Sequence, residues 1–282
     1  MRSLVLPCLL VLLASVLTAQ TAFTRLDEGD ARDIAAARGT FVIIDFYANW
    51  CGPCKTMDDK VWSLDTIQSV QEAFVNIRVD ASTSNAGLLR YGIKAIPALI
   101  IMDANGEEYF RKVGYLQPEE ILELLDRFPA DMRGAYAADI VAKQESDAFN
   151  SHFLRARHYQ EAARSAKRSI AGKLAATSDA ALKSAHKILA KNANNPASLL
   201  EYLALMEAEN LVLRGRAKKA LKALAAIGEE VNAKNEALAC YIKGMAYRRS
   251  GKPELAQDCY EQLRGAPGNE VFLTMYEAEE RR

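Results

Sequence analysis

Histidine and cysteine are scarce in this sequence of 282 residues, which contains 3 histidines and 5 cysteines. A structural zinc site needs four cysteine or histidine ligands, and the histidines (His152, His158 and His186) lie far along the chain from the close pair Cys51 and Cys54. We therefore expect no metal. Cleavage of a signal peptide that contains Cys8 would leave four cysteines, which are too few for a disulfide scaffold, so the close pair indicates redox chemistry instead.

The sequence also lacks a net charge and a second long apolar run. Its 36 Lys and Arg residues balance 36 Asp and Glu residues, so whole-chain electrostatics do not indicate nucleic-acid binding. The start of the chain is typical of a signal peptide: the positive Arg2 precedes an apolar run at 4–17, and small residues follow up to Ala22. We assign the signal peptide to residues 1–20. The run is short for a membrane span, although an uncleaved anchor is the alternative.

Charge and composition divide the rest of the chain into two parts. Residues 20–130 hold 11 Lys and Arg against 17 Asp and Glu, whereas residues 150–234 hold 15 against 7. After Pro129, Ala, Leu, Lys and Glu dominate and β-branched residues become rare. We therefore predict one domain over residues 21–129 and a second, all-helical domain over residues 130–282.

The first part alternates strand and helix signals. Short runs rich in β-branched and aromatic residues predict strands at 41–47, 74–79, 98–102 and 108–113. A turn separates the last two strands as a hairpin. Pro118 and the acidic residues after it predict the start of a helix that ends near residue 128. This order is typical of an α/β domain with a central sheet.

The second part contains a weak helical repeat. Gly244 and Ala256 would let two antiparallel helices approach, Tyr247 and Tyr260 would fill the space between them, and Gly251 would make the turn. The pattern resembles a tetratricopeptide repeat, with a plain helical bundle as the alternative.

An earlier copy of this pattern lies 36 residues upstream, where Gly215 and Ala220 match the positions of the later turn glycine and alanine. Residues 157–162 resemble a further turn between helices. The fold class predicted for the whole chain is therefore an α/β domain followed by an all-α, tetratricopeptide-like helical-repeat domain.

The sequence Cys51-Gly52-Pro53-Cys54 stands between a predicted strand and a predicted helix. At a helix N-terminus, unpaired backbone N–H groups and the helix dipole stabilise a thiolate, which is the nucleophile in disulfide exchange. We therefore expect Cys51 to attack. Cys54, one turn into the helix and more buried, would resolve the mixed disulfide.

These residues resemble the active-site segment of the thioredoxin family, over residues 44–55 (IDFYANWCGPCK). Residues 91–97 (YGIKAIP) resemble the second signature of that family, and Asn105-Gly106 and Val113-Gly114 resemble its closing hairpin. The resemblance covers roughly residues 23–128 and implies a thioredoxin fold.

The resemblance also implies roles for individual residues. Pro97 would be a cis-proline that keeps a backbone edge open beside the disulfide. Asp45 would be the buried carboxylate that takes the proton from Cys54 through a water. Burial would raise the pKa of Asp45, and a surface-facing side chain is the alternative. The residues implied to support the site are Trp50, which would cover it, Gly52, Pro53 and Ile96.

Two departures from the family pattern stand out. Asn76 occupies the position where family members often have a lysine near the buried aspartate, so proton handling by Asp45 is expected to differ. Residues 60–69 resemble exported domains that work with membrane reductases.

The remaining cysteines, Cys240 and Cys259, fall on the two helices of the better repeat. Small buried core residues and a structural disulfide are the two interpretations.

We expect an exported thiol–disulfide oxidoreductase, with the reducing direction favoured by the Gly-Pro dipeptide, that needs no cofactor and acts on protein thiols and disulfides. Its electrons would come from a membrane or soluble donor. The family pattern favours a bacterial periplasm or cell envelope over a secretory lumen. The alternative is a chaperone-like protein whose helical repeats bind peptide or protein partners.

Overall fold

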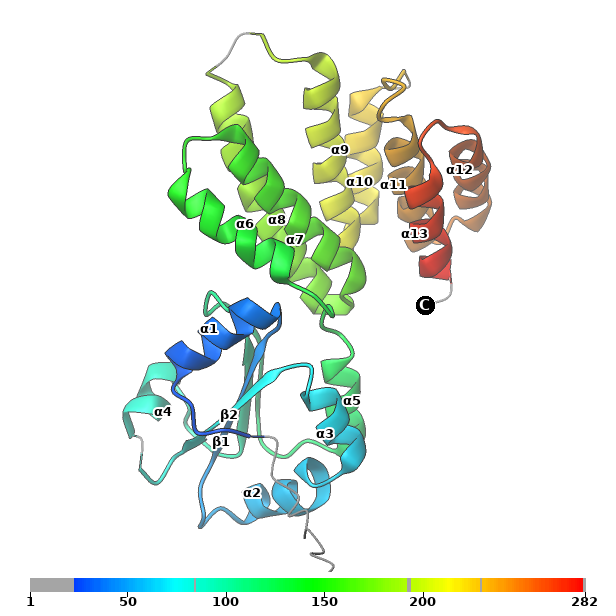
Figure 1. The fold of residues 1–282 in the computed structure, drawn as a ribbon. Helices are drawn as coiled ribbons and strands as arrows, with labels where there is room; N and C mark the ends of the chain where they lie inside the picture. Colours follow the sequence, from blue (N-terminus) through cyan, green and yellow to red (C-terminus); the bar gives the residue numbers. More distant parts are fainter. Residues whose placement is uncertain (1–22, 84, 192–193, 229, 281–282) are drawn as a thin grey trace, which may run out of the picture.

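The computed structural model describes residues 23–280, apart from residues 84, 192, 193 and 229 (Figure 1). The predicted signal peptide, residues 1–20, lies outside the described residues. An α/β domain comes first and an all-helical region follows, which confirms the predicted order of the two fold classes.

A four-stranded sheet forms the centre of the first domain. Its strands are β1 (Val42–Tyr47), β2 (Val75–Asp80), β3 (Ala98–Met102) and β4 (Glu108–Val113). The spatial order is β2-β1-β3-β4, with β1 parallel to β2 and antiparallel to β3. The apolar runs of the sequence therefore predicted all four strands to within one residue at either end.

Helices cover both faces of this sheet. They are α1 (Glu28–Arg38), α2 (Gly52–Met57), the π-helical turn η1 (Asp58–Trp62), α3 (Asp65–Gln71), α4 (Asn85–Tyr91) and α5 (Pro118–Leu125). Because successive side chains of a strand point to opposite faces, Ile43 packs with α2, η1, α3 and α5, and Ile44 packs with α1 and α4. Both isoleucines are buried.

The second part consists of antiparallel helices that follow one another in space (Figure 1). They are α6 (Arg133–Gln144), α7 (Phe149–Ser165), α8 (Arg168–Leu189), α9 (Ala197–Leu213), α10 (Ala217–Ile227), α11 (Glu236–Arg249), α12 (Pro253–Gly265) and α13 (Glu270–Glu280). In the described part of the chain, no helix is long and apolar enough to cross a membrane.

The glycines singled out from the repeat pattern make the expected turns and contacts. Gly251 joins α11 to α12 with φ of 72°, and Gly215 joins α9 to α10 with φ of 71°, values that favour glycine. A Cβ added at Gly244 would lie 2.7 Å from the Tyr276 ring and 3.2 Å from the Cys259 Cβ, so only glycine permits this close packing. The match to a tetratricopeptide repeat as such stays a prediction.

The turn predicted at residues 157–162 is wrong, because these residues lie inside α7. Tyr159, Ala162 and Ala163 recur at helical spacing, and all three are buried. Burial of this face keeps the segment helical, although its polar residues resemble those of a turn.

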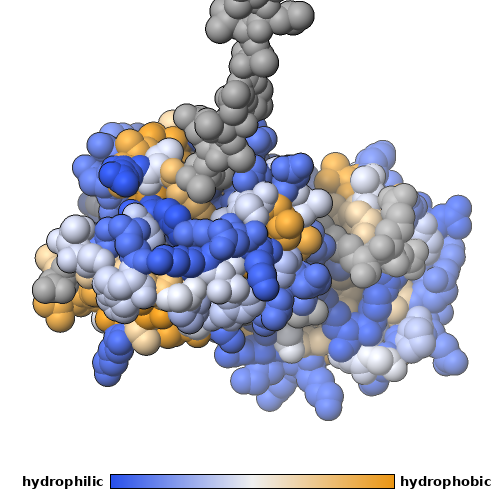
Figure 2. Space-filling view, turned by 90° about the horizontal axis from the view of Figure 1, so that it is seen from below, coloured by the Kyte–Doolittle hydropathy of each residue, from blue (hydrophilic) through white to orange (hydrophobic). Residues whose placement is uncertain are grey.

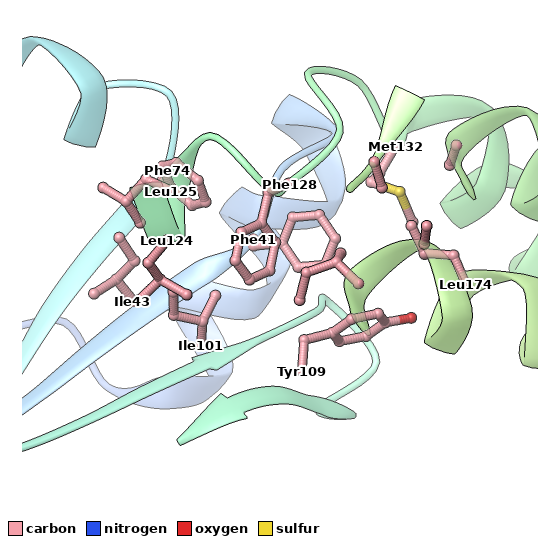
Figure 3. Packing of buried hydrophobic residues seen from close by; sticks show 14 of the residues in the cluster. Phe41, Ile43, Phe74, Ile101, Tyr109, Leu124, Leu125, Phe128, Met132 and Leu174 are labelled. Atoms are coloured by element: carbon pink, nitrogen blue, oxygen red, sulfur yellow. The ribbon is translucent and has the colours of Figure 1, made fainter. Parts of the chain in front are cut away.

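The two parts of the chain share one hydrophobic core. Figure 3 shows Phe41 and Phe128 from the α/β domain in line with Met132 and Leu174 at the base of the helices. Burying such a side chain contributes roughly 1.5–3 kcal/mol, whereas an exposed ion pair contributes about 0–1 kcal/mol. Apolar packing therefore holds the junction more strongly than surface ion pairs such as Lys167–Asp126.

The helical region lies at one end of the sheet, and α2 lies at the other (Figure 1). The hydroxyl of Tyr136 on α6 donates a hydrogen bond to the carbonyl of Thr40, just before β1, at 2.9 Å. The junction therefore lies at the start of β1, and α2 follows the end of that strand, away from the helices.

Candidate active site

Cys51 lies between the end of β1 and the first turn of α2, where it is the N-cap residue. Its sulfur accepts a hydrogen bond from the backbone N–H of Cys54 at 3.2 Å. Pro53 lies in the first turn, where its missing N–H costs no helical hydrogen bond. The two cysteines form a disulfide.

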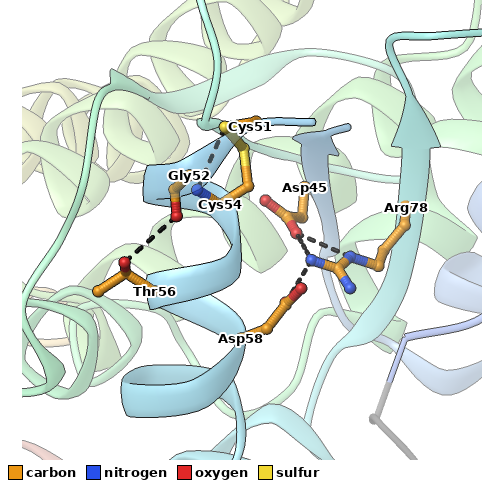
Figure 4. Close-up of a disulfide and its surroundings, with 7 residues drawn as sticks. All are labelled: Asp45, Cys51, Gly52, Cys54, Thr56, Asp58 and Arg78. Carbon is orange, nitrogen blue, oxygen red and sulfur yellow. Dashed lines mark hydrogen bonds and ion pairs between the residues drawn. A yellow bond between two sulfur atoms is a disulfide. The ribbon is translucent and has the colours of Figure 1, made fainter. Parts of the chain in front are cut away.

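The disulfide is almost completely covered by protein. Cys51 is 4% exposed and Cys54 2%, so the expected contrast between an accessible and a buried cysteine is small in this oxidised state. Trp50, predicted to cover the site, is 72% exposed. Gly52 is exposed too, and its carbonyl accepts a hydrogen bond from the Thr56 hydroxyl (Figure 4).

The loop before β3 reaches the disulfide from the side. The Ile96–Pro97 peptide bond is cis, as the family resemblance implied. Ile96 packs against the small cluster that contains both cysteines, and Pro97 is buried. The carbonyl of Pro97 accepts a hydrogen bond from the N–H of Gly114 at 2.8 Å, which ties the loop to the end of β4.

Asp45 is buried in the middle of β1, with 1% of its surface exposed. Figure 4 shows one of its carboxylate oxygens on the side of Cys54 and the other on the side of Arg78. Burial raises the pKa of Asp45 from its ordinary 3.8 to about 6, and the attraction of Arg78 limits the rise. A carboxyl group with this pKa can exchange a proton near neutral pH.

Arg78 is the functional neighbour that the sequence reasoning missed. It stands directly opposite Asp45 on β2, and its Nε and Nη2 lie 2.8 and 2.6 Å from Asp45 Oδ2. The same Nη2 lies 2.6 Å from Oδ1 of Asp58 on η1. A cation therefore does lie beside Asp45, although the family-matched position, Asn76, supplies none.

Asn76 has a different role. It stands opposite Ile43, and its amide donates a hydrogen bond to the carbonyl of Gln71 at 2.8 Å. Because side chains two residues apart share a face of a strand, Arg78 points to the same face as Asn76. The register between the two strands, had it been known, would have identified Arg78.

Cys240 and Cys259 are free thiols on α11 and α12. Burial raises the pKa of Cys240, and it raises that of Cys259 to about 11. Both thiols are therefore protonated and unreactive at neutral pH, in line with a packing role. Among the described residues, no group of three or more His, Cys, Asp or Glu residues is placed to hold a metal ion.

The end of the molecule that carries α2 presents a mixed surface. Figure 2, seen from below, shows separate hydrophobic patches among hydrophilic residues. The most exposed large apolar side chains of the α/β domain are Leu89 and Trp50, at 80% and 72%. Trp50 directly precedes Cys51, so an apolar surface lies beside the disulfide.

Comparison with known proteins agrees with this geometry. Residues 29–129 match the family model described as a thioredoxin-like domain. The chain is 35% identical to thioredoxin of Bacillus subtilis over 86 residues, which cover 30% of this chain and 80% of that protein.

Two further relatives belong to a longer protein. The chain is 32% identical over 96 residues to the thiol:disulfide interchange protein DsbD of Cronobacter sakazakii, covering 32% of this chain but 17% of that protein. The oxidised C-terminal domain of DsbD from Neisseria meningitidis aligns with 34% of this chain and 87% of its own, at 27% identity and a TM-score of 0.30.

Proposed function

Since this chain belongs to the thioredoxin family and is a thiol–disulfide oxidoreductase, we propose that it is an exported enzyme that reduces disulfides in other proteins. The observation that carries this proposal is the Cys51–Cys54 disulfide at the start of α2, beside cis-Pro97 and the buried Asp45.

The reaction starts from the reduced dithiol. The Cys51 thiolate, stabilised by the N–H groups at the start of α2, attacks one sulfur of a client disulfide. The client S–S bond breaks, its second sulfur leaves as a thiolate, and Cys51 is joined to the client in a mixed disulfide. As the family resemblance implies, the client strand would pair with the backbone edge beside Pro97.

The second step releases the client. The Cys54 thiol gives its proton to Asp45 through a water, and the resulting thiolate attacks the sulfur of Cys51. The bond to the client breaks, the client sulfur that was bound to Cys51 leaves as a thiolate that takes up a proton from the solvent, and the Cys51–Cys54 disulfide forms. Two electrons have then passed from the enzyme to the client, and a membrane or soluble donor must reduce the enzyme again.

Two features of the sequence support export and direction. The Arg2 start and the apolar run 4–17 are typical of a signal peptide. The Gly-Pro dipeptide resembles that of reducing family members. We expect a tagged full-length chain, produced in a bacterium, to lose its first residues and to be released by osmotic shock; a full-length cytoplasmic product would contradict export.

A trapping variant tests the reaction. In Cys54→Ser the first step proceeds but the resolving thiol is missing, so covalent complexes between enzyme and client should accumulate. They would appear as high-mass bands on non-reducing gels and disappear with dithiothreitol. The double variant Cys51→Ser/Cys54→Ser is the matched control, and equal amounts of complex with both variants would refute the mechanism.

A second candidate function is the binding of protein partners by the helical region. A hollow of about 700 Å³ between α10 and α11 has a mixed lining, in which apolar side chains such as Leu221 and Leu224 alternate with charged ones such as Glu236 and Lys243. Suppression of client aggregation by the double variant Cys51→Ala/Cys54→Ala would support this function, and loss of all activity in that variant would count against it.

A further inference from the structure

The guanidinium of Arg78 is shared between two carboxylates behind the disulfide. Its Nη2 lies 2.6 Å from Asp45 Oδ2 and 2.6 Å from Asp58 Oδ1, so these two oxygens are at most twice that distance apart. Burial favours the neutral form of Arg78, but the two carboxylates more than offset this and raise its pKa. Arg78 therefore stays positively charged, and both carboxylates form ion pairs with it.

Aromatic rings hold the same guanidinium in place. Its central carbon lies 4.2 Å from the centre of the Tyr47 ring and 5.1 Å from that of Phe23. The Arg78 side chain is 13% exposed and that of Asp58 is 32% exposed. Asp58 is thus the partner on the solvent side, whereas Asp45 is the buried partner.

Few other charges act on Asp45. The charged groups that influence it are Arg78 from β2 and Asp58 from η1. Its partner on β3 is the apolar Leu99, and Cys54 on α2 does not titrate while it is in the disulfide. Burial is the largest influence on the pKa of Asp45, and the charges that modify this influence are those of Arg78 and Asp58.

We propose that Asp58 is a positioning residue for the redox reaction: it holds the solvent-side edge of the Arg78 guanidinium and so keeps Asp45 basic enough to accept the proton of Cys54. Without Asp58, the whole charge of Arg78 would act on Asp45 and favour its ionised form. The inference rests on the role given to Asp45 in the proposed function.

The test is Asp58→Asn in the full chain, with Asp59→Asn as the matched control. Asp59 is the next residue and is exposed, so its variant removes the same charge from the same turn without touching the ion pair with Arg78. The titration of Asp45 is followed by carboxyl ¹³C NMR on the oxidised protein, and the signal is assigned by its loss in Asp45→Asn.

We expect Asp58→Asn to lower the midpoint of Asp45 by about one pH unit, because Arg78 then acts on Asp45 alone and a nearby cation favours the ionised carboxylate. Asp59→Asn should move it by less than about 0.3 pH unit, because an exposed charge is screened. Asp58→Glu keeps the negative charge, so its Asp45 midpoint should stay close to that of the wild type. An unchanged midpoint in Asp58→Asn, or an equal shift in the control, would overturn the proposal.

A double-mutant cycle separates the action through Arg78 from direct repulsion. In an Arg78→Met background, Asp58→Asn should shift the Asp45 midpoint by less than half as much as in the wild type. Equal shifts in both backgrounds would show that Asp58 acts directly and would refute the positioning role. These titrations need no turnover, so a failure here is distinguishable from a failure of the trapping experiment.

Discussion

Cys51→Ser should abolish the reduction of a model protein disulfide, with a loss of rate on the order of a thousandfold or more. Serine has nearly the same size as cysteine, but its hydroxyl is not ionised at neutral pH and does not form a mixed disulfide. The expected loss therefore comes from chemistry and not from packing. The measurement is the rate of insulin disulfide reduction with dithiothreitol as the electron source.

Cys240→Ser is the matched control for this loss. It makes the same substitution at a half-buried cysteine on α11, far along the chain from the dithiol. We expect its rate to stay within about twofold of the wild type, because burial keeps that thiol protonated. A Cys51→Ser variant that reduced insulin at the wild-type rate would end the assignment of Cys51 as the nucleophile.

Asp45→Asn should change the pH dependence of stability in the oxidised protein. An aspartate has an ordinary pKa of 3.8, which applies to Asp45 in the unfolded chain, whereas the pKa of Asp45 in the folded protein is about 6. As pH rises between these values, the unfolded chain loses the proton before the folded protein does, so the wild type loses stability. Each pH unit is worth about 1.4 kcal/mol, which gives a loss on the order of 3 kcal/mol above pH 6.

Asparagine cannot ionise, so the variant escapes this loss. Its free energy of unfolding, relative to the wild type, should therefore rise by on the order of 3 kcal/mol between pH 3.5 and pH 8. Urea unfolding followed by circular dichroism at both pH values measures the change, with the exposed Asp59→Asn as control. A constant difference between variant and wild type at the two pH values would contradict the burial argument.

The residues that follow local rules were predicted from sequence. The four strands are apolar runs, and Cys51 and Cys54 stand at the predicted junction of strand and helix. The cis bond before Pro97 came from the family resemblance, because sequence alone makes a cis bond before proline uncommon. The burial of Asp45 followed from its place in an otherwise apolar strand.

The ion pairs around Asp45 depend on tertiary structure and were missed. Arg78 reaches Asp45 because β1 and β2 pair in one particular parallel register, which no local pattern specifies. Asp58 reaches Arg78 because η1 follows α2 across the same face of the sheet. The family pattern placed the expected cation at position 76, which is Asn76, whereas the cation beside Asp45 is Arg78, two residues further along β2.

The junction between the two parts of the chain was also beyond sequence reasoning. Composition separated the parts at Pro129, but it did not reveal that Phe128 and Met132 belong to one core with Leu174. An apolar helical face does not identify its partner, since a neighbouring helix and a sheet bury it equally well. The same core contains Tyr159, whose burial explains why the turn predicted there is helix.

The reduction potential of the Cys51–Cys54 pair tests the central claim most directly. It is measured by equilibrating the full chain with glutathione or dithiothreitol redox buffers and determining the fraction oxidised. We predict a potential of about −270 mV, which is typical of a thioredoxin-type reductase that needs an electron donor. A potential of about −120 mV would identify an oxidant that introduces disulfides and would contradict the assignment as a reductase.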